Sequence, residues 1–192
     1  MRITANIFLI AILLLTSYSF GQKNRIFTNL EETLLVSPDS IYRLDLSKKK
    51  LNTLPEEIKK FKNLQELNLS KNKLTDLPNW FLFEDLRILN LSKNKIITFP
   101  SEIMKNTNLR HLFLGKNTLS EIPETIDKLQ NLIILDLWYN PITDLPESLV
   151  NLRNLRSLDL SGLNFDKNFQ KKWNSLLPWV KIEFEAACNC AN

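Results

Sequence analysis

The chain has 192 residues, of which 44% are hydrophobic and 24% charged, a composition typical of one folded domain of ordinary size. The net charge of +4 is too small to indicate nucleic-acid binding, one histidine and two cysteines do not complete a four-ligand zinc site, and three glycines leave no room for a glycine-rich phosphate loop. We therefore expect no cofactor, no bound metal and no enzymatic activity.

The first 21 residues have the organisation of a secretory signal peptide. Arg2 precedes an apolar run from Ile7 to Leu15, and the small residues Ser19 and Gly21 follow at the spacing of a cleavage site. The run is shorter than the roughly 20 apolar residues that cross a bilayer. We expect cleavage before Gln22 and a mature protein without a membrane span, secreted or held in the cell envelope. The alternative is an uncleaved membrane anchor.

Residues 22–40 are predicted to form a linker and an N-terminal cap helix. The helix is expected over residues 28–36, with Leu30 and Leu34 facing inward and Pro38 ending it. Glu31 or Glu32 would complete a capping box at its start.

Residues 41–163 contain six copies of one pattern. The copies begin at Ile41, Leu64, Leu86, Leu109, Leu132 and Leu155, with spacings of 23, 22, 23, 23 and 23 residues. Each reads LxxLxLxxNxL or a near variant, and the first five continue into LPxxI or a variant of it. In LxxLxL the apolar fourth and sixth positions alternate with polar ones, which predicts a strand with one buried face. A proline at one phase, followed by acidic residues, predicts a short helical turn on the outer side of each unit.

The ninth position of the inner units is always asparagine: Asn72, Asn94, Asn117 and Asn140. An asparagine side chain offers one acceptor and two donors, so stacked copies are expected to satisfy buried backbone groups where the chain leaves the strand.

This pattern resembles the leucine-rich-repeat family, in its 23-residue class, and is similar to secreted bacterial members. The resemblance implies an α/β solenoid, a curved horseshoe with a parallel sheet on its concave face, short helical turns on the convex side and a cap at each end. It also implies protein binding through the concave face.

Residues 164–185 are predicted to form the C-terminal cap. Phe165, Phe169, Trp173, Leu176 and Leu177 recur at helical spacing, and a last strand follows in which Trp179, Ile182 and Phe184 take the LxxLxL phase. The alternative for the Trp173 helix is a partner-binding face. In the tail, residues 186–192, Cys188 and Cys190 are free to pair with each other, to pair with another chain or to remain reduced.

Outward-facing strand positions give a candidate partner-binding site in the middle units. Its residues are Ile88, His111, Phe113, Ile134 and Trp138, with Tyr139 beside them. An apolar patch on a soluble protein indicates an interaction site, although a loop or cap that covers it would be the alternative. Asp136 and Asp159 belong to the same site, since they occupy one column on adjacent strands, where like charges repel unless water, Arg156, a basic group of a partner or Ca²⁺ compensates.

A second candidate surface is an edge of lysines. Lys48, Lys71, Lys93 and Lys116 hold the eighth position of successive units, and Lys50, Lys73 and Lys95 the tenth. This edge either serves solubility or binds an anionic partner such as a surface polysaccharide or an acidic protein. Because no aromatic residues interleave with the lysines, nucleic acid is not expected.

Together these features predict a secreted or surface-displayed protein–protein interaction module. The alternative is a binder of anionic glycan or envelope polysaccharide through the lysine edge, and an enzyme is the least supported reading.

Overall fold

A computed structural model describes residues 23–184. The predicted signal peptide, its cleavage site before Gln22, and the tail cysteines Cys188 and Cys190 lie outside these residues. No helix in residues 23–184 is long and apolar enough to cross a membrane.

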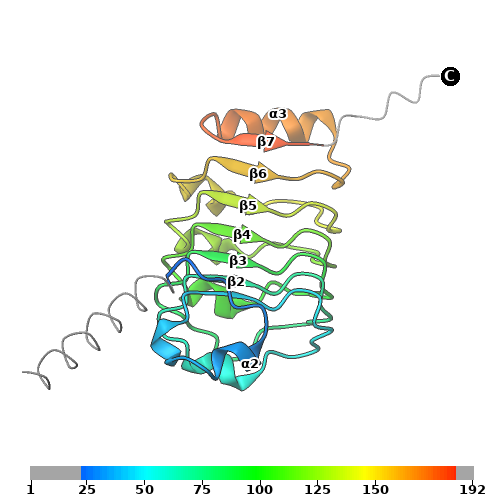
Figure 1. Cartoon of the computed structure of the whole chain (residues 1–192). Helices are drawn as coiled ribbons and strands as arrows, with labels where there is room; N and C mark the ends of the chain where they lie inside the picture. Colours follow the sequence, from blue (N-terminus) through cyan, green and yellow to red (C-terminus); the bar gives the residue numbers. More distant parts are fainter. Residues whose placement is uncertain (1–22, 185–192) are drawn as a thin grey trace, which may run out of the picture.

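Seven short parallel strands, one from each of the six units and one from the C-terminal cap, form an open sheet in chain order (Figure 1). The strands are β1 (Arg43–Asp45), β2 (Glu66–Asn68), β3 (Ile88–Asn90), β4 (His111–Phe113), β5 (Ile134–Asp136), β6 (Ser157–Asp159) and β7 (Lys181–Glu183). Equivalent positions of neighbouring units are paired without a shift, for example Leu89 with Leu112. The predicted α/β leucine-rich-repeat solenoid is confirmed.

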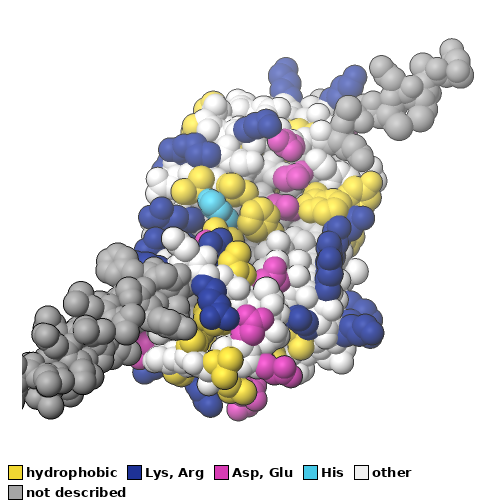
Figure 2. Space-filling model, in the orientation of Figure 1, with side chains coloured by type: hydrophobic (Ala, Val, Ile, Leu, Met, Phe, Trp, Pro, Cys, Tyr) yellow, Lys and Arg dark blue, Asp and Glu magenta, His cyan; other side chains and the backbone are white. Residues whose placement is uncertain are grey.

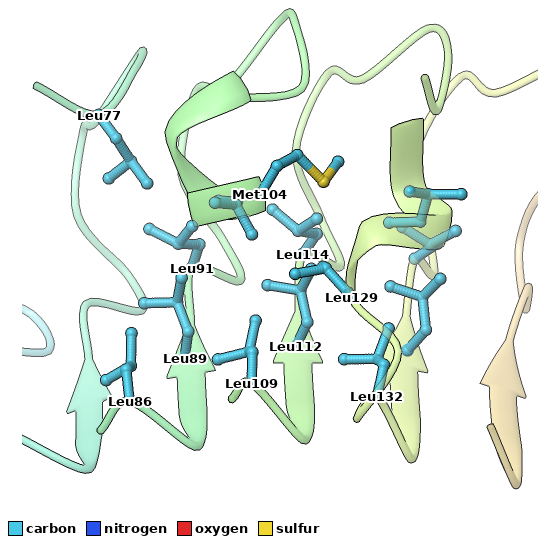
Figure 3. Close-up of a cluster of buried hydrophobic side chains, with 14 of the residues drawn as sticks. Leu77, Leu86, Leu89, Leu91, Met104, Leu109, Leu112, Leu114, Leu129 and Leu132 are labelled. Atoms are coloured by element: carbon cyan, nitrogen blue, oxygen red, sulfur yellow. The ribbon is translucent and has the colours of Figure 1, made fainter. Parts of the chain in front are cut away.

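The leucines of the LxxLxL pattern form one continuous core. In the third and fourth units, Leu86, Leu89, Leu91, Leu109 and Leu112 are all fully buried and point into the interior between the sheet and the outer turns (Figure 3). No unit could bury these side chains alone, so stacking is what stabilises each unit.

The asparagine ladder satisfies the backbone at the turn after each strand. Asn117 accepts a hydrogen bond from the Ile96 N–H at 3.1 Å and donates to the Leu91 and Leu114 carbonyls at 3.0 and 2.8 Å. Asn72, Asn94 and Asn140 make the same set of bonds. This predicted role is confirmed.

A second asparagine ladder is formed by the residue that directly precedes the first leucine of four units. The Nδ2 atoms of Asn63, Asn108, Asn131 and Asn154 each donate to the backbone carbonyl 24 residues earlier in the chain, at 2.7–3.0 Å. Asp85 holds this position in the third unit, and its carboxylate cannot donate in this way. Sequence analysis missed this ladder, although Asn-Leu recurs at the start of four units.

The outer turns are 3-10 helices: η2 (Glu56–Lys60), η3 (Ser101–Lys105), η4 (Glu124–Lys128) and η5 (Glu147–Asn151). In each the proline precedes the first helical residue. The prediction of a helical turn in every unit is wrong for the second unit, where only a turn from Pro78 to Phe81 forms. That unit is one residue shorter, and it buries Phe81 and Phe83 edge to face, with ring centroids 5.2 Å apart.

The N-terminal end is closed by Phe27, which is fully buried and pairs with Leu44 of β1. The helix that follows, α2 (Leu30–Thr33), is shorter than predicted, and Asn29 caps it by accepting from the Glu32 N–H at 2.8 Å. A short 3-10 turn, η1 (Pro38–Ser40), leads into the first unit. Leu30 packs against the core as predicted, but Leu34 is 80% exposed. The prediction for Leu34 is wrong because the helix ends before its side chain can turn inward.

The C-terminal end is closed by α3 (Lys167–Leu176) and β7. Trp173 is fully buried, Phe165 and Phe169 stack with ring centroids 3.7 Å apart, and Ile182 pairs with Leu158. Leu176 is 40% exposed, so its predicted place inside the cap is wrong, whereas Leu177, predicted with it, is fully buried.

Candidate partner-binding site

The centre of the sheet face carries a group of apolar side chains in register. Ile88, His111 and Ile134 are paired across β3, β4 and β5. Phe113 lies next to His111, with ring centroids 6.4 Å apart and the rings nearly perpendicular. All four side chains are half-buried, and we name Ile88, His111, Phe113 and Ile134 the sheet-face patch.

Phe113 interrupts a row of polar side chains. The row consists of Asp45, Asn68, Asn90, Asp136 and Asp159, each of which accepts a hydrogen bond from the N–H two residues later. The phenyl ring of Phe113 cannot accept from the Gly115 N–H in this way. At this position β4 is therefore apolar, whereas the neighbouring strands β3 and β5 have the polar residues Asn90 and Asp136.

Trp138 and Tyr139 form a right-angled pair at the end of β5, with ring centroids 5.5 Å apart and planes at 89°. We name this pair the aromatic corner. The Trp138 indole rests on Gly115, one unit earlier, and the Tyr139 ring rests on Gly162, one unit later. At either glycine a side chain would meet the ring, so the two glycines determine where the two rings lie.

The structure thus divides the predicted site into two neighbouring parts. The Trp138 ring contacts Gly115, which lies two residues after Phe113. The aromatic corner therefore adjoins the sheet-face patch. In the space-filling view, hydrophobic side chains gather over the middle strands, with Lys and Arg along both lateral edges (Figure 2). Toward the N-terminus, a hollow of about 200 Å³ extends from Ile88 and Phe113 to Arg43.

Asp136 and Asp159 lie side by side in register, as the sequence pattern places them. Burial and the nearby Asp159 carboxylate raise the pKa of Asp136 to about 6, against the opposing effect of the Trp138 N–H, which donates to Asp136 Oδ1 at 3.3 Å. Within residues 23–184 no group of three or more His, Cys, Asp or Glu side chains is arranged to hold a metal ion.

His111 belongs to the apolar side of the site. Partial burial lowers its pKa, the Arg110 charge lowers it further, and Glu66 acts in the opposite direction. Near neutral pH the imidazole is therefore mainly uncharged, which suits a patch formed with Ile88, Phe113 and Ile134.

The lysine edge runs along the turns that follow the strands. All seven side chains, Lys48, Lys50, Lys71, Lys73, Lys93, Lys95 and Lys116, are exposed. The four eighth-position lysines have φ between 54° and 60°, a left-handed conformation that costs a non-glycine residue about 1–2 kcal/mol. The Nζ atoms of Lys93 and Lys116 lie over the Trp138 ring, 5.7 and 5.1 Å from its centroid, and Lys116 is also 5.3 Å from the centroid of Tyr139.

The contacts of the two aromatic rings with Gly115 and Gly162, and with the lysines, were not predicted from the sequence. The signal was a glycine at the seventh position of the fourth unit, where the first three units have serine, and a glycine at the eighth position of the sixth unit, where four units have lysine. The two glycines lie in the units on either side of the fifth unit, which has Trp138 at the seventh position and Tyr139 at the eighth.

A parallel sheet in strict register, a leucine core and an asparagine ladder define a repeat solenoid. A model described as "leucine-rich repeat" matches residues 39–96, and a "leucine-rich repeat region" model matches residues 80–171. The chain belongs to the leucine-rich-repeat family.

Solved structures with this fold include a leucine-rich-repeat protein of Leptospira interrogans, 30% identical, with a TM-score of 0.64 over 76% of this chain and 43% of that one. Another is the ectodomain of the receptor kinase GASSHO1/SCHENGEN3 from Arabidopsis thaliana in complex with CASPARIAN STRIP INTEGRITY FACTOR 2, 25% identical, with a TM-score of 0.60 over 75% of this chain and 18% of that one.

Among curated relatives, human Toll-like receptor 1 is 42% identical over 52 residues, or 27% of this chain, and human Toll-like receptor 6 is 38% identical over 69 residues, or 32% of this chain. The chain spans only 7% and 8% of these receptors. Leucine-rich-repeat proteins of this kind generally mediate protein–protein interaction.

Proposed function

We propose that this protein is an exported protein-binding module and that the sheet-face patch and the aromatic corner bind its partner. The observation that carries the proposal is Phe113, which places an apolar side chain in a row that is otherwise Asp, Asn or Glu and so joins the apolar side chains into one surface. Interface hot spots are rich in aromatic residues and lie inside a polar rim, and Asn90, Asp136 and Asp159 supply such a rim here.

Export is supported by the N-terminal pattern from Arg2 to Gly21. It is also supported by the likeness to receptor ectodomains, one of which was solved in complex with CASPARIAN STRIP INTEGRITY FACTOR 2. An intact-mass measurement of the exported protein tests this part of the proposal. A product that begins at Gln22 supports it, and a membrane-bound product that retains residues 1–21 overturns it.

The binding surface is tested by replacing two of its aromatic residues together. We expect Phe113→Ala with Trp138→Ala to leave the fold nearly intact, because both side chains lie outside the leucine core. The free energy of binding to a partner isolated from the native surroundings should weaken by at least about 2 kcal/mol, the scale of a hot-spot truncation. Binding is measured by calorimetry, and folding by circular dichroism.

The matched control replaces two exposed apolar residues elsewhere, Leu35→Ala with Leu82→Ala, which are 84% and 48% exposed. This control should bind as the unmodified protein does. If the Phe113/Trp138 variant unfolds, or binds as tightly as the control, the assigned surface is wrong.

A second candidate function is the binding of an anionic glycan along the lysine edge. The specific observation that favours it is the alignment of seven exposed lysines along the turns of successive units. Binding of this kind should weaken steeply between about 50 and 300 mM salt, because exposed charges are screened within roughly 10 Å at 0.1 M.

A further inference from the structure

We infer that Lys93, Lys116 and the aromatic corner form a subsite for a carboxylate of the protein partner, so that the binding segment of the partner carries an acidic residue beside an apolar one. This inference rests on the proposed function and specifies the chemistry of its partner.

The rings are held in place by the glycines of the two neighbouring units. Trp138 touches Gly115 and Tyr139 touches Gly162, so that a Cβ at residue 162 would stand 2.7 Å from Tyr139 Cδ2. Lysine ammonium groups lie over both rings. The groups presented to a ligand are the ammonium groups themselves.

The two ammonium groups lie over the same aromatic ring. Lys93 and Lys116 lie on adjacent units, and both place Nζ within 6 Å of the Trp138 centroid. Their backbones are held in parallel by the bonds from Lys93 N–H to the Gly115 carbonyl at 2.8 Å and from Lys116 N–H to the Trp138 carbonyl at 2.7 Å. Cation–π attraction therefore orders two long side chains that would otherwise be free in solvent.

These two charges have no counter-charge of their own. Within residues 23–184, neither Lys93 nor Lys116 has a carboxylate oxygen within 4.0 Å, whereas Lys105 and Lys181 have theirs at 3.9 and 2.5 Å. A carboxylate that binds both ammonium groups would make charge-assisted hydrogen bonds, which are about twice as strong as neutral ones.

The neighbouring surface favours a protein over a polysaccharide as the source of that carboxylate. The sheet-face patch adjoins the corner and consists of branched aliphatic and aromatic side chains, among them Ile88, Phe113 and Ile134. A peptide segment can place a Leu, Ile or Phe side chain on this patch and a Glu or Asp on the lysines. A polyuronate offers only the charge.

The test is selection from a phage-displayed library of random 12-residue peptides against the purified protein. It is run in parallel against Lys93→Gln with Lys116→Gln and against a matched control, Lys48→Gln with Lys71→Gln. The control residues share the repeat position and the backbone conformation of the first pair, but within residues 23–184 neither has its ammonium group over an aromatic ring, as Lys93 and Lys116 do. We expect Asp or Glu next to Leu, Ile or Phe to be enriched severalfold on the unmodified protein and on the control, and not on the Lys93/Lys116 variant.

The selected peptide is then made with its acidic residue as Glu and as Gln. The exchange should raise the Kd on the unmodified protein at least tenfold and leave the Kd on the Lys93/Lys116 variant within about twofold. Equal acidic enrichment on all three proteins, or none on any, would overturn the inference.

Two further outcomes separate the inference from the proposed function. Peptides that require Phe113 but show no acidic preference leave the proposed function standing and remove the lysine subsite. An absence of any peptide that requires Phe113 counts against both. A decamer of galacturonate is the glycan probe: if it binds, and if both lysine pairs weaken it equally, the edge is a continuous polyanion site and the carboxylate subsite is wrong.

Discussion

The five-membered ring of Trp138 lies on the α-carbon of Gly115, so that a methyl group at residue 115 would overlap the ring atoms Cδ1 and Nε1. The equivalent residue of the first three units is serine. The fourth unit has no side chain at this place, and the fifth unit fills the space with an indole. This relationship gives the most direct test of the site geometry.

Gly115→Ala should displace the Trp138 ring from its contact with residue 115. We expect a red shift of the tryptophan emission and a loss of about 1–3 kcal/mol in the free energy of unfolding, the range for overpacking. In a Trp138→Ala background the same glycine substitution should cost less than about 1 kcal/mol, because the overlapping atoms are gone. Equal costs in the two backgrounds, measured by urea unfolding, would show that the ring does not lie on Gly115.

Asp136→Asn should stabilise the protein at neutral pH but not at acidic pH. The pKa of Asp136 is about 6 in the folded protein against an ordinary value of 3.8, so the folded state binds more protons than the unfolded state between these values. The stability that this proton uptake gives is complete below about pH 4 and is lost as the pH rises through 6.

Asparagine keeps the acceptor for the Trp138 N–H, as Asn68 and Asn90 do for theirs. After allowance for solvent screening, we expect a gain of about 1–2 kcal/mol at pH 7 and little at pH 4. An NMR titration of Asp136 gives an independent check, since Asp159→Asn should lower its pKa by removing the neighbouring charge. A stability difference that is the same at pH 4 and pH 7 would contradict the assignment.

Trp173→Ala should cost about 3–5 kcal/mol, the range for removal of a buried aromatic side chain. Trp173 is fully buried at the end of the leucine core, whereas Leu176 on the same helix is 40% exposed and serves as the control. Leu176→Ala should cost much less. If Trp173→Ala left the melting temperature unchanged and abolished partner binding, the helix would be a binding face and not a cap.

Asn117→Ala should be costly, and Asn131→Ala should be mild. Asn117 is 7% exposed and serves three backbone groups, which would lose their partners inside the protein. Each unsatisfied buried group costs about 1–3 kcal/mol. Asn131 donates to the Thr107 carbonyl at 3.0 Å in an exposed position, where water can replace it, so its loss should cost less than about 1 kcal/mol. Thermal unfolding of the two variants makes the comparison.

The repeat made the interior of the fold predictable. Each inner unit has a neighbour on both sides, so the phase of a residue decides its surroundings, and the buried places of Leu89, Leu112 and Asn117 follow from their positions in the pattern. The units at the two ends have a neighbour on one side only, and there the position of a residue in the pattern did not predict whether it is buried. Leu34 and Leu176 have the spacing of buried residues, yet short helices leave both exposed.

The site was predictable as a set of residues but not as a geometry. Which way Trp138 and Tyr139 turn depends on where a neighbouring unit lacks a side chain, and that unit lies one repeat away in the chain. A strand pattern read unit by unit does not contain this information. Comparison of the same phase in successive units does, because Gly115 and Gly162 stand beside the two aromatic residues in their columns.

The two glycine seats also have a mechanical consequence. Trp138 reaches back to the fourth unit and Tyr139 reaches forward to the sixth, so the side chains of one unit bridge both of its joints on the outside of the core. Bending or sliding of these units requires the two rings to lose their contacts with Gly115 and Gly162. A ligand that keeps the rings seated therefore stiffens the middle of the solenoid, and a ligand that lifts them makes it more compliant.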